Sequence, residues 1–100
     1  MVTLGYRTAL DAAHKLLDYE GKCAQLHGHT WKVQVELVGE VRSDGMVMDF
    51  HEVKEMVGDV VNKYDHQDLN LFFAQPTCEN IAIRLFQDLT NALYHRGYKT

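Results

Sequence analysis

The stretch Cys23-Ala-Gln-Leu-His27-Gly-His29-Thr-Trp31-Lys-Val-Gln-Val35 decides both the expected fold and the expected chemistry of this chain. From Trp31 onward, apolar and polar residues alternate, which is the pattern of a half-buried β-strand. Residues two apart in an extended chain point to the same face, so His27 and His29 share the face of Trp31. We therefore expect a strand that follows a His-Gly-His turn and carries imidazoles on one face.

A second alternating segment, Val2 to His14, precedes this stretch. Its even positions form the more apolar face, and His14 lies on that face. Two paired strands could direct His14, His27 and His29 toward one point. Neutral imidazole is a common zinc ligand. The three histidines therefore predict a zinc site.

The role of Cys23 stays open at this level. A catalytic zinc site usually has three protein ligands and an open fourth position, whereas a structural site fills all four. Cys23 either closes the site as the fourth ligand or lies beside it as a reactive thiol. The two other histidines that stand alone, His51 and His95, are expected at the surface.

Length and composition indicate one domain, residues 1–100. Its expected fold class is α+β. The net charge of −4 argues against a nucleic-acid partner. No apolar run approaches the roughly 20 residues of a membrane span, and no signal-peptide pattern is present, so we expect a cytoplasmic protein without a membrane partner. In that compartment the two cysteines are expected to be thiols.

Two helices are expected after the strands. Apolar residues recur at helical spacing from 50 to 64, with Asp49 as N-cap and a turn at Asp44-Gly45 before it. Pro76-Thr77 opens the second helix, where Thr77 is the candidate cap, and Gly97 ends it. The final residues, 97–100, have the pattern of entry into a third strand. Because a two-stranded sheet is marginal and its edges invite pairing, we expect a homo-oligomer.

The connection between the helices contains Asp65-His66. A carboxylate can orient an imidazole, and the imidazole can exchange a proton with a thiol near neutral pH. Cys23 is the favoured thiol. Cys78, at a helix start, ranks second because no histidine stands at motif spacing from it.

Taken together, these segments resemble the 6-pyruvoyltetrahydropterin synthase family, and within it the bacterial 6-carboxytetrahydropterin synthase branch of queuosine biosynthesis. The matching pieces run in the family's order over nearly the whole chain. They are Ala12-Ala13-His14, Cys23-x3-His27-Gly-His29, Gly45-Met-Val-Met-Asp-Phe50, Asp65-His66-x2-Leu69-Asn70 and Pro76-Thr77-x-Glu79-Asn80-Ile81-Ala82.

The resemblance implies the tunnelling fold (T-fold), an antiparallel sheet with two helices on one face. It implies subunits assembled as a hexamer, a dimer of trimers, with active sites at subunit boundaries. It further implies Zn²⁺ on His14, His27 and His29, and a catalytic triad. The triad consists of Cys23, Asp65 and His66. Thr77 resembles a family position whose backbone contacts the pterin.

The implied reaction is a lyase reaction on a pterin triphosphate, with no organic cofactor. 7,8-Dihydroneopterin triphosphate would give 6-carboxy-5,6,7,8-tetrahydropterin, acetaldehyde and triphosphate. Two alternatives remain: a 6-pyruvoyltetrahydropterin synthase, which only eliminates triphosphate, and a non-catalytic zinc-binding fragment with Cys23 as fourth ligand. In the family two more strands follow the second helix, and the last one supplies a pterin-binding Glu. This sequence stops before them, so we expect that C-terminal strand pair to be missing. Glu79 does not take that role.

Overall fold

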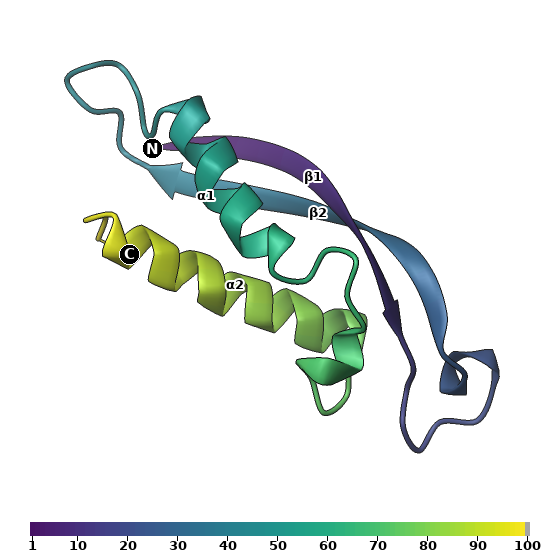
Figure 1. Cartoon of the computed structure of the whole chain (residues 1–100). Helices are drawn as coiled ribbons and strands as arrows, with labels where there is room; N and C mark the ends of the chain where they lie inside the picture. Colours follow the sequence, from purple (N-terminus) through teal and green to yellow (C-terminus); the bar gives the residue numbers. More distant parts are fainter. Residues whose placement is uncertain (100) are drawn as a thin grey trace.

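The computed structural model describes residues 1–99 and shows two long strands and two helices (Figure 1). In chain order the elements are β1 (Val2–His14), β2 (His27–Gly39), α1 (Phe50–Asn62) and α2 (Cys78–His95). The strands pair as an antiparallel two-stranded sheet. Buried side chains of both helices and of one sheet face form a single apolar cluster. The predicted α+β class, with an antiparallel sheet and two helices, is confirmed.

The alternating pattern places the two strands as expected. Their register runs from Val2 opposite Gly39 to His14 opposite His27. On the even face of β1, Leu10, Ala12 and His14 are all buried. An exposed polar face and a buried apolar face are usual for a sheet that is covered on one side.

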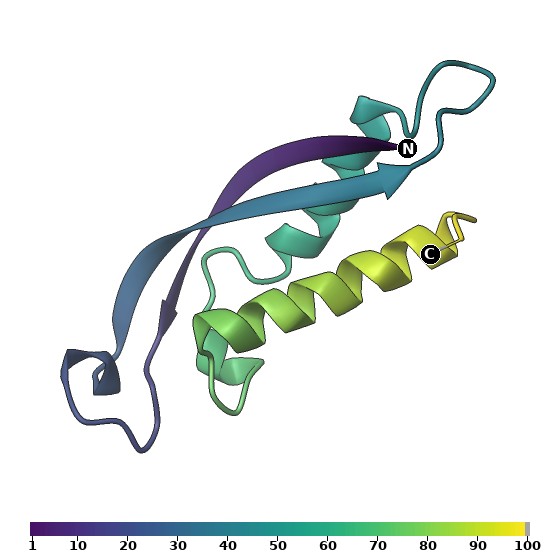
Figure 2. The same cartoon turned by 180° about the vertical axis from the view of Figure 1, so that it is seen from behind.

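The predicted His-Gly-His turn is wrong, because these residues belong to β2. His27, Gly28 and His29 pair with His14, Ala13 and Ala12, so the ladder continues to the last residue of β1. Their backbone groups are satisfied by that pairing, which a turn at this position would lose. The chain reverses instead through residues 15–26, which include a short 3₁₀ helix at Lys22–Ala24. This end of the sheet projects beyond the helices (Figure 2).

Both predicted helix starts are confirmed. The Asp49 side chain accepts a hydrogen bond from the backbone N–H of His51, and the Thr77 side chain accepts one from that of Asn80. Such bonds satisfy donors that the first helical turn leaves free. The apolar stripe of each helix faces the core. Its buried members are Val53, Met56, Val57, Val60 and Val61 in α1 and Ile81 and Leu85 in α2.

Residues 97–99, which have the pattern of entry into a third strand, form no strand; Thr100 lies outside the described residues. Gly97 has a φ of +89°, which glycine adopts without a Cβ penalty. This lets the Tyr98 N–H bond back to the carbonyl of Leu93 at 3.0 Å. The Tyr98 hydroxyl also donates to the carboxylate of Glu52 on α1. These bonds hold residues 97 and 98 as a helix-ending turn.

Neither helix in the described part of the chain combines the length and the apolar character that crossing a membrane requires.

Candidate metal centre and active site

Three imidazoles meet where the two strands end. His14 is the last residue of β1, and His27 and His29 lie at the start of β2. One ring nitrogen of each lies within 4.8 Å of the others. The Nε2 atoms of His14 and His27 are 3.1 Å apart. The predicted convergence of these three side chains on one point is therefore present in a single chain.

Backbone carbonyls define the orientation of two of these rings. The Nδ1 of His14 lies 2.7 Å from the carbonyl oxygen of Pro76, and that of His27 lies 2.7 Å from the carbonyl oxygen of Gln25. A carbonyl can only accept, so each Nδ1 carries the proton. Each Nε2 then has a free lone pair. Metal-binding histidines are commonly held by their second nitrogen in this way.

The contact between the two Nε2 atoms tests whether a metal fits. When both rings are neutral, neither Nε2 atom carries a proton, so the two lone pairs face each other at 3.1 Å and cannot form a hydrogen bond. A cation shared by both atoms would turn this repulsion into attraction. Burial lowers the pKa of His14; the bond to Pro76 opposes this effect, and the charges of His27 and His29 add to it. The neutral form that a metal ligand requires is thus favoured.

The donor set matches zinc chemistry. Three imidazole nitrogens and no carboxylate make up the group, and borderline metals such as zinc favour nitrogen ligands. Within residues 1–99 the group does not include Cys23. Cys23 lies in the 3₁₀ helix as a half-buried free thiol. Its backbone carbonyl accepts a bond of 2.8 Å from the N–H of Leu16.

Trp31 supports the imidazoles, which we did not predict. Its ring lies edge-on to His14 and His29, at centroid distances of 4.8 and 5.2 Å. Its Nε1–H donates to the carbonyl of Ala12 at 3.1 Å, which fixes the indole. The sequence did contain a signal for this packing: a tryptophan two positions after His29, on the same strand face. The Pro76 carbonyl has no such signal, since it is a backbone atom distant in sequence.

The connection between the helices presents Asp65 and His66 together. The Nδ1 of His66 lies 3.1 Å from Asp65 Oδ2, and the other carboxylate oxygen of Asp65 accepts from the Asp11 N–H at 2.8 Å. The bond from Asp11 is the main cause that lowers the pKa of Asp65, with His66 contributing. Asp65 therefore stays ionised, and the imidazole of His66 is mostly exposed. The predicted carboxylate–imidazole pair is formed.

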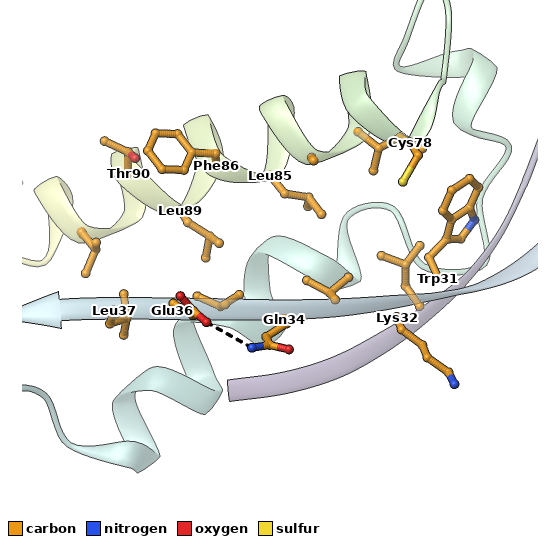
Figure 3. Close-up of a pocket in the computed structure, with 16 residues that line it drawn as sticks. Trp31, Lys32, Gln34, Glu36, Leu37, Cys78, Leu85, Phe86, Leu89 and Thr90 are labelled. Atoms are coloured by element: carbon orange, nitrogen blue, oxygen red, sulfur yellow. Dashed lines mark hydrogen bonds between the residues drawn. The ribbon is translucent and has the colours of Figure 1, made fainter. Parts of the chain in front are cut away.

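An apolar groove runs between β2 and α2, away from these groups (Figure 3). Leu85, Phe86 and Leu89 line it from the helix, and Trp31 and Cys78 lie at one end. Cys78, the second-ranked thiol, lines this groove, but none of the favoured site residues does. We therefore locate the candidate site at the imidazoles.

Comparison with known proteins agrees with this geometry. The sequence pattern of the family described as 6-pyruvoyl tetrahydropterin synthase matches residues 3–100. The chain belongs to this family. A relative from Archaeoglobus fulgidus, named a putative 6-carboxy-5,6,7,8-tetrahydropterin synthase, is 45% identical over 86 residues, covering 86% of this chain and 74% of the relative. A dihydroneopterin monophosphate aldolase from Pyrococcus furiosus is 44% identical over 80 residues, covering 78% of this chain and 66% of the relative.

A solved structure of the same family confirms the fold. The 6-pyruvoyl tetrahydropterin synthase of Caenorhabditis elegans matches with a TM-score of 0.76 and 31% identity, covering 91% of this chain and 78% of that one. The tunnelling fold predicted from the motifs is thereby confirmed. The chain is thus a member of a family of pterin synthases, and it spans between 66% and 78% of the length of these three relatives.

Within the described residues of one chain, hydrogen bonds do not join all three members of the predicted triad, Cys23, Asp65 and His66. Asp65 and His66 bind the backbone of Asp11 at the edge of β1, whereas the His14 side chain points to the buried face. Among residues 1–99, no hydrogen bond joins the Cys23 thiol to either of them. The Thr77 hydroxyl is already engaged as the α2 cap. Its predicted pterin contact would therefore use the backbone, and it stays a prediction. His51 and His95 are exposed, as expected.

Proposed function

We propose that this protein is a zinc-dependent lyase acting on 7,8-dihydroneopterin triphosphate. With water, the reaction would give 6-carboxy-5,6,7,8-tetrahydropterin, acetaldehyde and triphosphate, a step of queuosine biosynthesis. Relatives from Archaeoglobus, Haemophilus and Synechocystis carry names of this type at 38–45% identity. The Cys23-x3-His27 spacing, which resembles the carboxy-forming branch, also supports this choice. We assign the reaction to the cytoplasm, as the sequence predicts.

The observation that carries the proposal is the convergence of three imidazoles in one chain, with the Nε2 atoms of His14 and His27 only 3.1 Å apart. His14, His27 and His29 would hold the Zn²⁺ ion. When bound, zinc supplies a Lewis acid that polarises a side-chain oxygen of the substrate. The carbonyls of Pro76 and Gln25 keep two of the ligand rings oriented, so little reorganisation accompanies binding.

Cys23 and His66 would move the protons. A thiol reacts as its thiolate, and an imidazole can take or return a proton near neutral pH. Asp65, ionised and bonded to His66 Nδ1, would keep the opposite ring nitrogen, Nε2, directed outward for exchange. Asp65 would thereby act on the ring through orientation and charge.

We further propose that a second copy of the chain completes the site. Cys23 and the Asp65–His66 pair are not joined in one chain, so His66 of a neighbouring subunit would serve the Cys23 thiol. The hexamer implied by the family resemblance, a dimer of trimers, provides such boundaries. Mixing a Cys23→Ala variant with a His66→Ala variant tests this directly. Recovery of activity after subunit exchange supports a shared site, and failure to recover argues for a site within one chain.

The reaction itself is tested by anaerobic incubation of the zinc-loaded protein with 7,8-dihydroneopterin triphosphate. Products are identified by mass spectrometry, with Cys23→Ala as the test variant and Cys78→Ala as the matched control. We expect 6-carboxytetrahydropterin and acetaldehyde from the wild type and the control only. A Cys23→Ala protein that also loses its zinc would instead support a closed site with the thiol as fourth ligand. A 6-pyruvoyl product would support triphosphate elimination alone.

A second candidate is aldol cleavage of a dihydroneopterin phosphate. It is favoured by the Pyrococcus furiosus relative, which is named a dihydroneopterin monophosphate aldolase. The same assay with dihydroneopterin monophosphate separates the two functions. Cleavage of the monophosphate, with no carboxylated product from the triphosphate, would replace the first proposal with the second.

A further inference from the structure

We infer that Asp11 is a positioning residue for His66, holding the Asp65–His66 pair on the free edge of β1 and placing a second carboxylate beside the imidazole. The inference rests on the proposed proton-transfer role of His66. Asp11 lies on the polar face of β1, opposite to the face that carries His14. Its backbone contacts the Asp65–His66 pair, and its side chain contacts Thr30.

The backbone of Asp11 binds both members of the pair. Its N–H donates to Asp65 Oδ1 at 2.8 Å, and its carbonyl accepts from the His66 N–H at 2.6 Å. Two residues further along β1, the Ala13 N–H donates to the carbonyl of Gln67 at 3.0 Å. The connection therefore runs along the edge of β1 as a short paired segment. His66 has a φ of +59°, an uncommon value for a residue with a side chain, and these bonds hold it there.

The carboxylate of Asp11 is fixed by the neighbouring strand. Thr30 lies directly opposite Asp11 in the sheet, and its hydroxyl donates to Asp11 Oδ1 at 2.5 Å. A carboxylate oxygen of Asp11, one of Asp65 and a ring nitrogen of His66 all lie within 4.8 Å of one another. His66 is thus flanked by one carboxylate bonded to its ring and a second carboxylate fixed by Thr30.

An imidazolium formed at His66 during proton transfer would be attracted by both carboxylates. The other ionisable groups that line the same shallow hollow are Asp68 of the connection and His29 of β2. Asp68 is engaged as the cap of the short 3₁₀ helix at Leu69–Leu71, and His29 belongs to the imidazole group. Asp11 is the carboxylate in the hollow that is neither part of the pair nor engaged as a cap. Its chemical contribution is to place a negative charge beside the imidazole, where it stabilises the imidazolium that proton transfer forms at His66.

The test compares Asp11→Asn with a matched charge control, Glu40→Gln, which lies at the opposite end of the sheet. Asparagine keeps the backbone bonds and can still accept from Thr30, so fold and zinc content should be unchanged. In the zinc-loaded protein, the ring proton signals of His66 are followed by NMR against pH. We expect the Asp11→Asn variant to shift the His66 titration midpoint down by about half a pH unit or more. With 7,8-dihydroneopterin triphosphate, kcat should fall about tenfold and KM change less than about twofold.

A second variant, Thr30→Val, separates position from charge. It releases the Asp11 carboxylate but retains its charge, so we expect a smaller midpoint shift and a fall in kcat. An unchanged His66 midpoint in Asp11→Asn would overturn the inference, even if activity fell. A shifted midpoint in a protein with no activity on the pterin would keep the placement of Asp11 and reject the proposed function instead.

Discussion

The Nδ1 of His14 donates to the carbonyl oxygen of Pro76 across 2.7 Å, although 62 positions separate the two residues in the chain. Pro76 ends the connection that carries His66 and stands just before the α2 cap, Thr77. The ring of a candidate metal ligand is therefore oriented by the same segment that presents the candidate proton-transfer group. We therefore expect metal binding at His14 to depend on the structure of this connection, and metal binding to stabilise the connection in turn.

The first prediction concerns the metal ligand itself. Changing His14 to Ala should weaken zinc binding by more than about a hundredfold, because loss of an outer-shell partner alone typically costs ten- to a hundredfold. Affinity is measured by competition with a chromophoric chelator. His95→Ala, which removes an exposed imidazole, serves as control. Equal zinc affinity in the two variants would show that the three imidazoles are not the metal site.

The second prediction concerns Asn70, which ties the connection to the chain after β1. Its Oδ1 accepts from the Lys15 N–H at 2.9 Å, and its Nδ2 donates to the Lys15 carbonyl at 3.0 Å. Asn70→Ala removes both bonds and should lower the free energy of unfolding by roughly 1–3 kcal/mol. Urea denaturation measures the change. Asn91→Ala, on the exposed side of α2, should stay within about 0.5 kcal/mol of wild type. Similar losses in both variants would contradict a specific role for Asn70.

The third prediction is a pH dependence at Tyr64, which is 2% exposed and donates its hydroxyl proton to Asp88. Burial, and then Asp88, raises the pKa of Tyr64 to about 12. The folded state thus keeps a proton that the unfolded state releases near pH 10. Stability from this group is complete below pH 10 and is lost as the pH rises toward 12.

Unfolding free energies of wild type and Tyr64→Phe, measured from pH 8 upward, check this. Their difference should narrow between about pH 10 and 12, because phenylalanine does not ionise. Tyr19→Phe, at a half-exposed ring, is the control for tyrosine ionisation in general. A difference that stays constant across this range would show that Tyr64 ionises alike in both states.

The fourth prediction uses two glycines in different backbone conformations. Gly58 lies within α1, and a Cβ there would meet no atom within 4 Å. Gly58→Ala should therefore stabilise the protein by about 0.5–1 kcal/mol. Gly45 also has open space but a φ of +85°, so Gly45→Ala should destabilise by about 1–2 kcal/mol. Thermal unfolding measures both. A loss of stability in Gly58→Ala would mean that the helix is packed more tightly than this geometry shows.

Local features were largely predictable from the sequence. The caps Asp49 and Thr77 were recognised because capping depends on residues only two or three positions apart. The strand ending at His14 followed from its alternation. The His27-Gly-His29 turn was predicted wrongly, since strand pairing involves partners that the local pattern does not specify. Pairing with β1 extended the strand through these residues. The bond from Tyr98 to the carbonyl of Leu93, which ends α2, also had no local signal.

The sequence by itself determined which residues are candidates for the chemistry: three imidazoles on matching strand faces, a nearby thiol and an adjacent Asp65-His66. The residue types and the two-residue alternation of the strands identify these candidates, and both are local properties of the sequence. Only the tertiary structure decided how the groups are held. The carbonyl of Pro76 orients His14, Trp31 packs against the imidazoles, and Asp11 binds the pair at the edge of β1. These contacts join segments that are far apart in the chain, several of them through backbone atoms, which every residue possesses and no sequence pattern marks.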